Sequence, residues 1–234
     1  MKLQLKICTL LILLLSGCNK NNTINSIENF SQKTGKGLKD IDGNKYKSVI
    51  IGNQEWMAEN LKVTKYNDGT IIPLISDSTQ WISSNSGAYC YYKNNESNNL
   101  EYGKLYNWFA VSQKMNGNKN VCPSGWHIPT ILDWTELKDC IAQSPGSELK
   151  ESGTTHWNKP NVATNNTLFT ALPGGIRDEI SKFGSMGYAG YWWTASEKDS
   201  VSSISIYLMN INNSFYEYTI DMNTGQSVRC VLDK

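Results

Sequence analysis

The chain has 234 residues, and its charges nearly balance, with 22 Lys and Arg against 21 Asp and Glu for a net charge of +1. This balance, without a cluster of Lys and Arg, argues against nucleic-acid or anionic-membrane binding as the main function. A hydrophobic content of 39% excludes wholesale disorder, and 8 Trp, 12 Tyr and 18 Gly indicate a globular body rich in strands and loops. Only two His are present, which limits acid–base and metal chemistry, and we expect no cofactor and no metal site.

The first 17 residues have the three parts of a secretory signal peptide. Lys2 and Lys6 give a positive start, an apolar run follows over residues 7–15, and small residues precede Cys18. The run is about ten residues, half of what a bilayer span needs. Residues 15–18, Leu-Ser-Gly-Cys, resemble the processing box of bacterial lipoproteins, in which the Cys is acylated and becomes the first residue. We therefore predict lipidation at Cys18, the alternative being an ordinary signal peptide with an incidental Cys.

Residues 18–39 are polar and contain few large apolar side chains. This composition predicts a tether, which as a flexible coil would separate membrane and domain by about 25 Å. Nothing later in the chain has the length and hydropathy of a membrane span. Residues 40–234 are predicted to form a single domain, and the protein to lie in the bacterial cell envelope, held by its lipid anchor, with the outer membrane favoured.

The first half of the domain has strand signals and then helix signals. Residues 46–51 and 54–57 flank Gly-Asn and predict a hairpin. A short strand is expected within residues 89–92, and residues 104–114 carry apolar side chains at helical spacing. A second helix is better marked, because Thr130 can cap its start and Asp133 lies three residues on.

The second half is expected to be a long loop followed by strands. Residues 145–190 contain many Gly and Pro, and a structureless stretch of this length is often functional. Strands are expected at residues 191–194, 202–211, 215–220 and 226–231. This order of strands, two helices, a long loop and antiparallel strands predicts an α+β domain.

Several clusters of residues, taken together, resemble one known family. They are Asp42-Gly43-Asn44 with Tyr46, Ile51-Gly52 with Gln54, Trp56-Met57 and Glu59-Asn60-Leu61, Tyr102-Gly103 with Leu105-Tyr106-Asn107-Trp108, Cys122-Pro123 with Gly125-Trp126-His127 and Pro129-Thr130, Trp134 and Leu137, Leu172-Pro173-Gly174-Gly175 with Arg177, Gly190-Tyr191-Trp192-Trp193-Thr194, and Ser227-Val228-Arg229-Cys230-Val231. In this order they resemble the Fibrobacter succinogenes major paralogous domain, which is common in exported bacterial proteins. The resemblance covers about residues 40–231.

The resemblance implies a C-type-lectin-like fold with two helices, a small twisted antiparallel sheet and a long Gly-rich loop. It also implies a disulfide, because Cys122 and Cys230 occupy the positions that pair in such domains. A bridge closing about 107 residues could stabilise the fold by about 4–5 kcal/mol in the chain-entropy model. Spacing alone cannot choose among pairings, and it leaves open whether Cys90 pairs with Cys140 or whether Cys140 is a buried thiol.

The catalytic signals are weak. His127 has no second His, Cys pair or acidic residue at ligand spacing, so we expect a structural His bonded to backbone. No nucleophile elbow and no phosphate-binding Gly-rich loop occurs. The tripeptides with which C-type lectins hold calcium and sugar are absent as well. Residues 157–161, Trp-Asn-Lys-Pro-Asn, resemble one of them but place Lys159 where an acidic ligand belongs.

The first function hypothesis is a non-catalytic, membrane-anchored binding or adhesion module for glycan or protein. Its expected contact residues lie mostly in the long loop, where Trp157 would offer a flat face and Asn158 and Asn161 would supply amide groups. His156 and Trp81 are further candidates, Trp81 because it lies in a polar loop. For Trp157 the alternative is a structural residue that holds the loop to the domain. For the whole chain the alternative is an enzyme or enzyme accessory of the formylglycine-generating-like branch, marked by an exposed thiol of low pKa.

Overall fold

The computed structural model describes residues 33–141 and 144–234, which form an α+β domain. Cys18, the predicted signal peptide and residues 19–32 of the predicted tether lie outside the described residues. The helices are α1 (Ser78–Ile82), α2 (Asn98–Tyr102), α3 (Trp108–Val111), α4 (Ile131–Cys140) and α5 (Pro145–Leu149), with a 3-10 turn at Tyr92–Asn94. The strands are β1 (Lys33–Thr34), β2 (Leu38–Lys39), β3 (Lys45–Tyr46), β4 (Ser48–Ile51), β5 (Gln54–Met57), β6 (Tyr89–Cys90), β7 (Leu105–Tyr106), β8 (Trp126–His127), β9 (Ile176–Arg177), β10 (Phe183–Gly184), β11 (Ala189–Glu197), β12 (Ser202–Met209), β13 (Tyr216–Asp221) and β14 (Val231–Leu232).

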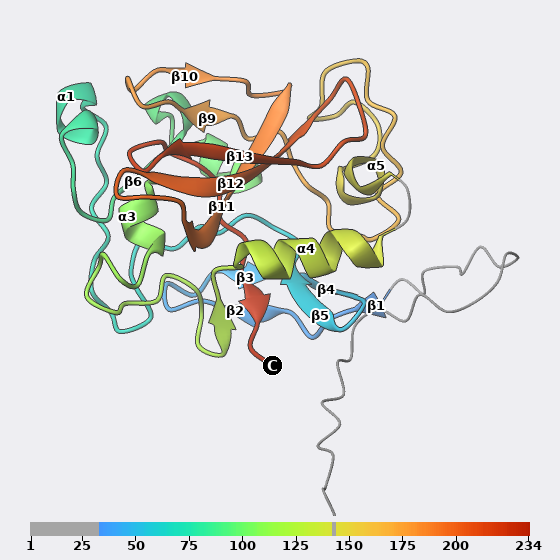
Figure 1. The fold of residues 1–234 in the computed structure, drawn as a ribbon, viewed down its shortest axis with the longest axis horizontal. Coiled ribbons are helices and arrows are strands. Elements are labelled where there is room, and N and C mark those ends of the chain that lie inside the picture. Colours follow the sequence, from blue (N-terminus) through green and yellow to red (C-terminus); the bar gives the residue numbers. More distant parts are fainter. Residues whose placement is uncertain (1–32, 142–143) are drawn as a thin grey trace, which may run out of the picture.

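Two sheets enclose α4. A five-stranded sheet in the order β1-β4-β5-β14-β8 lies on one side of the helix, and the antiparallel sheet β11-β12-β13 lies on the other (Figure 1). Trp134 and Leu137 of α4 share one buried apolar cluster with Trp56 of β5 and Trp192 of β11. The Trp56 and Trp134 rings lie 4.7 Å apart between centroids. The helix therefore fills the space between the two sheets.

The hairpin predicted around Gly52 is confirmed, since β4 pairs with β5 from Ser48↔Met57 to Ile51↔Gln54. The ordered strands begin earlier than predicted, however. Residues 33–39, assigned from sequence to the tether, contain β1, which pairs with β4, and β2, which pairs with β3. Backbone pairing needs no large apolar side chain, so the polar composition of this segment concealed the two strands.

The second predicted helix is confirmed in detail. The Thr130 side chain accepts from the Asp133 backbone N–H, and the Asp133 carboxylate accepts from the Thr130 N–H, which is a capping box. The first predicted helix is shorter than residues 104–114. Leu105 and Tyr106 instead form β7, paired with β6, and α3 starts only after Asn107, whose side chain accepts from the Ala110 N–H. A short apolar run of this kind fits a strand followed by one helical turn as well as it fits a helix.

The region predicted as one loop over residues 145–190 has more structure than expected. It begins with α5, contains the paired strands β9 and β10, and runs into β11. Between Lys150 and Gly175 the described chain has no helix and no strand longer than an isolated bridge, such as Lys150↔Ala171. Of the predicted C-terminal strands, three correspond to β11, β12 and β13, whereas β14 covers only Val231 and Leu232.

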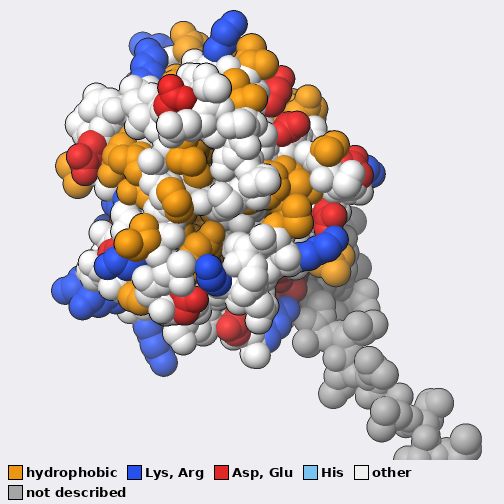
Figure 2. All heavy atoms as spheres, turned by 90° about the vertical axis from the view of Figure 1, so that its left-hand side faces the viewer, with side chains coloured by type: hydrophobic (Ala, Val, Ile, Leu, Met, Phe, Trp, Pro, Cys, Tyr) orange, Lys and Arg blue, Asp and Glu red, His pale blue; other side chains and the backbone are white. Residues whose placement is uncertain are grey.

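Within the described residues no helix has the length and hydropathy needed to cross a membrane. The exposed face that carries α1 shows hydrophobic side chains in separate groups among polar and charged ones (Figure 2).

Candidate binding surface

Three tyrosines stand side by side across the sheet β11-β12-β13. Tyr191 pairs with Tyr207 in the register of β11 and β12, and Tyr207 pairs with Tyr216 in the register of β12 and β13. Residues directly opposite one another on neighbouring strands point to the same face of a sheet. Tyr218 lies two residues beyond Tyr216 and shares that face. We call Tyr191, Tyr207, Tyr216 and Tyr218 the tyrosine row.

The rings of the row contact one another. Tyr191 and Tyr207 stack with centroids 5.5 Å apart and planes 25° apart, and Tyr207 and Tyr216 stack at 4.6 Å and 9°. Tyr218 meets Tyr207 edge to face at 6.2 Å. Aromatic pairs of this kind contribute about 0.5–1.5 kcal/mol each beyond the area that they bury. The contacts fix the rings in place before any partner arrives.

The row is accessible and polar at its tips. Tyr218 is 53% exposed, and the other three rings are partly exposed. The Tyr216 hydroxyl accepts a 2.9 Å hydrogen bond from Asn212 Nδ2. Burial, followed by the neighbouring Tyr216 and Tyr191, raises the pKa of Tyr207, so its hydroxyl stays protonated at neutral pH. A neutral phenol can both donate and accept hydrogen bonds.

The sheet under the row is firmly held. Trp192 and Trp193 of β11 point to opposite faces, as neighbours in a strand do, and each is buried in a different cluster. The Trp193 indole donates to the Tyr106 carbonyl over 2.7 Å, and the Trp192 indole donates to Asn60 Oδ1 over 2.9 Å. Rigid aromatic side chains on such a support lose little conformational entropy on binding.

Trp157 and Trp81, both expected as exposed contact residues, are buried, and for Trp157 the alternative of a structural residue agrees with the structure. Trp157 is 0% exposed and donates its indole N–H to the Ala171 carbonyl over 3.0 Å. Trp81 is also 0% exposed and donates to the Asn223 carbonyl over 2.6 Å. Neither ring offers a face to a ligand. Trp81 lies on the short helix α1 and Trp157 in the irregular segment, and burial of both indoles packs these elements against the domain.

The other residues predicted in this loop make internal contacts. Asn161 Nδ2 donates to the carbonyls of Glu151 and Gly153, which closes the loop on itself. Asn158 has an exposed side chain, and its carbonyl accepts from Asn210. His156 Nδ1 lies 2.8 Å from Glu151, and its Nε2 lies 3.6 Å from Glu101.

Buried cations hold the irregular segments, a role that sequence reasoning missed. Lys150, fully buried, donates to the carbonyls of Met209 and Asn212 over 2.7 Å and lies 5.4 Å from the Trp157 ring centroid. Arg229 donates to the carbonyls of Phe169 and Thr170. No carboxylate of the described chain pairs with either. Burial lowers the pKa of Lys150 to about 8 and that of Arg229 to about 9.

A second pair of buried cations acts in the same way elsewhere. Arg177 donates to the carbonyls of Ile75 and Ser76 and lies 4.4 Å from the Trp81 ring centroid. Lys104 donates to the Lys62 carbonyl, and burial lowers its pKa to about 8. These side chains satisfy loop carbonyls that would otherwise be buried without a partner.

The disulfide implied by the family resemblance is confirmed between Cys122 and Cys230. Cys90 does not pair with Cys140, because its thiol is free and buried. Burial raises the pKa of the Cys90 thiol to about 12, although Arg177 acts against the shift. Such a thiol is unreactive at neutral pH.

His127 has partners other than the backbone predicted for it. Its Nδ1 lies 2.6 Å from Asp233, and its Nε2 lies 3.5 Å from Asp133 at the start of α4. The bond to Asp133 leads the causes that raise the pKa of His127. Asp233 is far away in sequence, so spacing could not reveal this contact. Within residues 33–141 and 144–234 no group of three or more His, Cys, Asp or Glu is arranged to hold a metal ion.

A hollow of about 740 Å³ opens beside residues 34–37 and is lined by Ser48, Glu59 and Thr170 among others. Two of its polar side chains are engaged internally. Ser48 donates to Glu55 over 2.5 Å, and Glu59 accepts from the Lys47 N–H over 2.9 Å. The tyrosine row, which gathers four exposed or partly exposed rings on one face, is the stronger candidate for recognition.

The sequence held part of the signal for the row. The pattern Tyr216-x-Tyr218 lies in a predicted strand, and so do Tyr191 and Tyr207. Alternation places residues of one strand on a common face, but only the register between strands shows that three tyrosines coincide.

Comparison with known families agrees with the motifs. The model of the Fibrobacter succinogenes major domain matches residues 49–232. The chain belongs to this family. No curated protein and no solved structure matches the chain. The matched region includes all four members of the tyrosine row and the Cys122–Cys230 bridge.

Proposed function

We propose that this member of the Fibrobacter succinogenes major domain family is an envelope lipoprotein whose domain binds a glycan or a protein without catalysis. The tyrosine row carries the proposal. It brings four phenol groups together on one face of a sheet, and tyrosine is a side chain that binding surfaces favour. The four tyrosines of the row thus replace Trp157 and Trp81 as the proposed contact residues.

The proposed anchor is Cys18, acylated after removal of residues 1–17. The described domain begins at residue 33, so a tether over residues 19–32 would join it to the membrane. More than one acyl chain is needed for stable anchoring, and bacterial lipoproteins carry several. The proposed location is the cell envelope, most simply the outer membrane. The Cys18→Ala variant should remain unprocessed or be released from the membrane. Detection by mass spectrometry of a mature, unacylated N-terminus at another residue would contradict the proposed anchor.

We further propose that the domain is C-type-lectin-like. Support comes from α4 packed between two small sheets and from the bridge that joins Cys122, before β8, to Cys230, before β14. In this chain two buried cations tie the irregular segment to the domain, because Lys150 bonds the carbonyls of Met209 and Asn212 and Arg229 bonds those of Phe169 and Thr170.

The enzyme alternative required an exposed thiol of low pKa. Cys90 has the opposite character, since it is buried and its pKa is raised to about 12. No other observation favours the formylglycine-generating-like activity, and we do not propose it.

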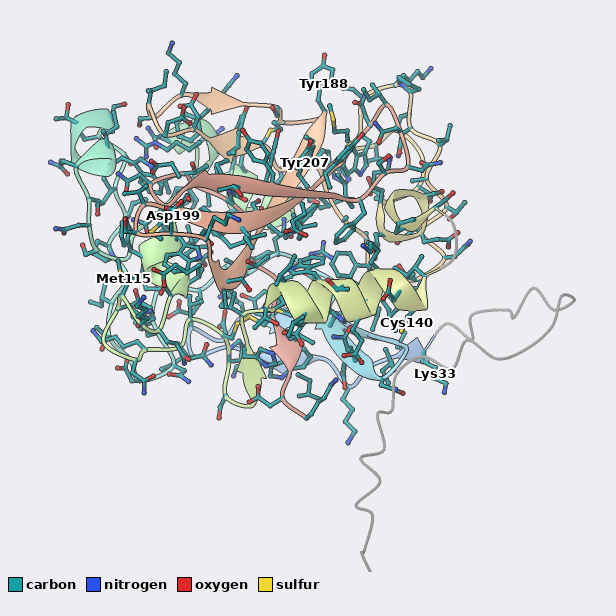
Figure 3. All side chains as sticks on the ribbon, in the orientation of Figure 1. Lys33, Met115, Cys140, Tyr188, Asp199 and Tyr207 are labelled. Atoms are coloured by element: carbon teal, nitrogen blue, oxygen red, sulfur yellow. A yellow bond between two sulfur atoms is a disulfide. The ribbon has the colours of Figure 1, made fainter. Side chains whose placement is uncertain are left out.

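The test is a binding screen of the purified full chain against envelope glycans and solubilised envelope proteins. Tyr218→Ala should weaken binding at least about tenfold, which corresponds to about 1.4 kcal/mol. Tyr188→Ala is the matched control, since Tyr188 is 56% exposed and makes no ring contact with the row within the described chain. In Figure 3 Tyr188 extends outward from the upper edge, whereas Tyr207 lies within the outline of the sheet. Equal binding by both variants would contradict the proposal.

A further inference from the structure

The outer edge of β13 has no strand partner among residues 33–141 and 144–234. β13 is the last strand of the sheet β11-β12-β13, and among the described strands it pairs only with β12. Glu217, Tyr218 and Thr219 are exposed along it. Natural edge strands are usually shortened, covered or broken by Pro, Lys or a bulge. The six residues of β13, Tyr-Glu-Tyr-Thr-Ile-Asp, include no Pro and no Lys, and their pairing with β12 is regular.

The register shows which backbone groups face outward. Beyond the end of β13, the Met222 N–H donates to the Val201 carbonyl over 3.0 Å, which makes this pair a hydrogen-bonded one. Hydrogen-bonded pairs alternate along an antiparallel ladder, so Ile220, Tyr218 and Tyr216 also bond inward to β12. The N–H and C=O groups of Glu217 and Thr219 therefore point away from the sheet.

The side chains of β13 indicate the charge of a strand that could pair with its outer edge. Glu217 and Asp221 are both exposed, and the strand has no basic residue. Glu217 forms no ion pair within the described chain. Pairing with a second copy of β13 would bring four carboxylates together at the interface with no cation on either strand. Their repulsion opposes self-pairing. A strand carrying Lys or Arg would instead meet opposite charge.

The tyrosine row continues to the same edge. Tyr216 ends the row, and since it bonds inward, its place opposite an added strand would be a non-hydrogen-bonded one, where facing side chains come closest. A residue of an added strand would thus pack beside the Tyr216 ring and lengthen the row by one step.

We propose that β13 binds an extended, basic segment of a partner protein by strand addition, with main-chain bonds to Glu217 and Thr219 and side-chain contact to the tyrosine row. This names a partner class for the surface in the proposed function and rests on that function only for the role of the row. Main-chain pairing gives such complexes affinity, and alternate side chains give specificity.

The probe is a fluorescein-labelled peptide of about ten residues in which Thr and Lys alternate, a usual upper length for a strand. Its control has Glu in place of Lys. The basic peptide should bind the full chain, and hydrogen exchange at Glu217 and Thr219 should slow on binding. Binding of both peptides alike, or of neither, would overturn the proposal.

Thr219→Pro separates strand addition from charge attraction. The substitution removes an N–H that points outward, and Pro is tolerated at such edge positions, so the pairing with β12 should survive. Binding of the basic peptide should weaken at least about tenfold. Thr219→Val, which keeps the N–H, is the matched control and should bind as the parent does. Unchanged binding by Thr219→Pro would overturn strand addition.

Glu217→Lys tests the charge, with Glu179→Lys, an exposed loop position, as the control of equal net charge. Only the Glu217→Lys variant should lose binding of the basic peptide. If Tyr218→Ala abolishes binding of envelope material while Thr219→Pro does not, the proposed function stands and strand addition is wrong. If neither variant affects that binding, both are wrong.

Discussion

The tyrosine row and the segment over residues 150–175 place aromatic residues in opposite ways. The row lies on regular strands and keeps its rings partly exposed, whereas the irregular segment buries Trp157 and Phe169 completely. Regular strands satisfy their own backbone groups, so their side chains are free to face solvent. An irregular segment has no such ladder. Arg229 bonds the carbonyls of Phe169 and Thr170 in this segment, and Lys150 at its start bonds the carbonyls of Met209 and Asn212. The large side chains of the segment pack into the domain.

This difference changes where binding is to be sought. A long irregular loop next to strong structural motifs suggests a recognition loop. Here the loop is packed through Trp157, which shares a buried cluster with Trp134 and Trp192. The exposed aromatic surface is found on the sheet instead.

The largest effect is expected from Trp157→Ala. Removing a fully buried indole leaves a cavity and frees the Ala171 carbonyl, so the free energy of unfolding should fall by about 3–5 kcal/mol. Urea denaturation measures the change, and Trp157→Phe, which keeps most of the volume, should lose less. A drop below about 1 kcal/mol for Trp157→Ala would show that the segment is not attached through this residue.

An intermediate effect is expected from pH. The pKa of Lys150 is about 8 in the folded state, below the value of 10.5 that an exposed lysine has. Between these values the unfolded chain binds more protons, so stability should rise as pH increases from about 7.5 to 9.5, before tyrosines ionise in the unfolded chain. Burying the charge is costly at lower pH and becomes less so as the amine loses its proton. Lys104 shifts in the same direction.

Lys150→Met isolates the contribution of this lysine. In this variant the free energy of unfolding should rise less between pH 7.5 and 9.5 than in the parent protein, by on the order of 1–3 kcal/mol. Thermal or urea denaturation at several pH values gives the slope, and Lys159→Met, at an exposed position, is the control. Parallel slopes for Lys150→Met and the parent protein would mean that the buried ammonium is fully compensated by the carbonyls of Met209 and Asn212.

The smallest effect on stability is expected at the surface. Tyr218→Ala removes a ring that is 53% exposed and one edge contact with Tyr207, so the free energy of unfolding should change by about 0.5 kcal/mol. Thermal denaturation beside Tyr188→Ala measures it. A loss of several kcal/mol would place Tyr218 with Trp157 as a structural residue and remove the contrast between the two regions.

Local sequence signals were reliable where the physical cause was local. The capping box of Thr130 and Asp133 and the turn after Ile51 both depend on residues a few positions apart. The family motifs, covering nearly the whole domain, also anticipated the Cys122–Cys230 bridge. The sequence was misleading at residues 104–106, where a strand replaces the start of a helix, and at residues 33–39, where polar residues form strands.

The sequence by itself determined the α+β class, the family and the helix after Thr130, because composition, motif order and capping are written in neighbouring residues. Only the tertiary structure decided which aromatic residues are exposed. Trp157 and Tyr218 both stand among polar neighbours in the sequence, yet one is buried and the other open. The burial of Trp157 depends on Lys150 and Ala171, and the exposure of Tyr218 depends on the register of β12 with β13. Contacts between distant segments set both, and no local pattern of side chains encodes them.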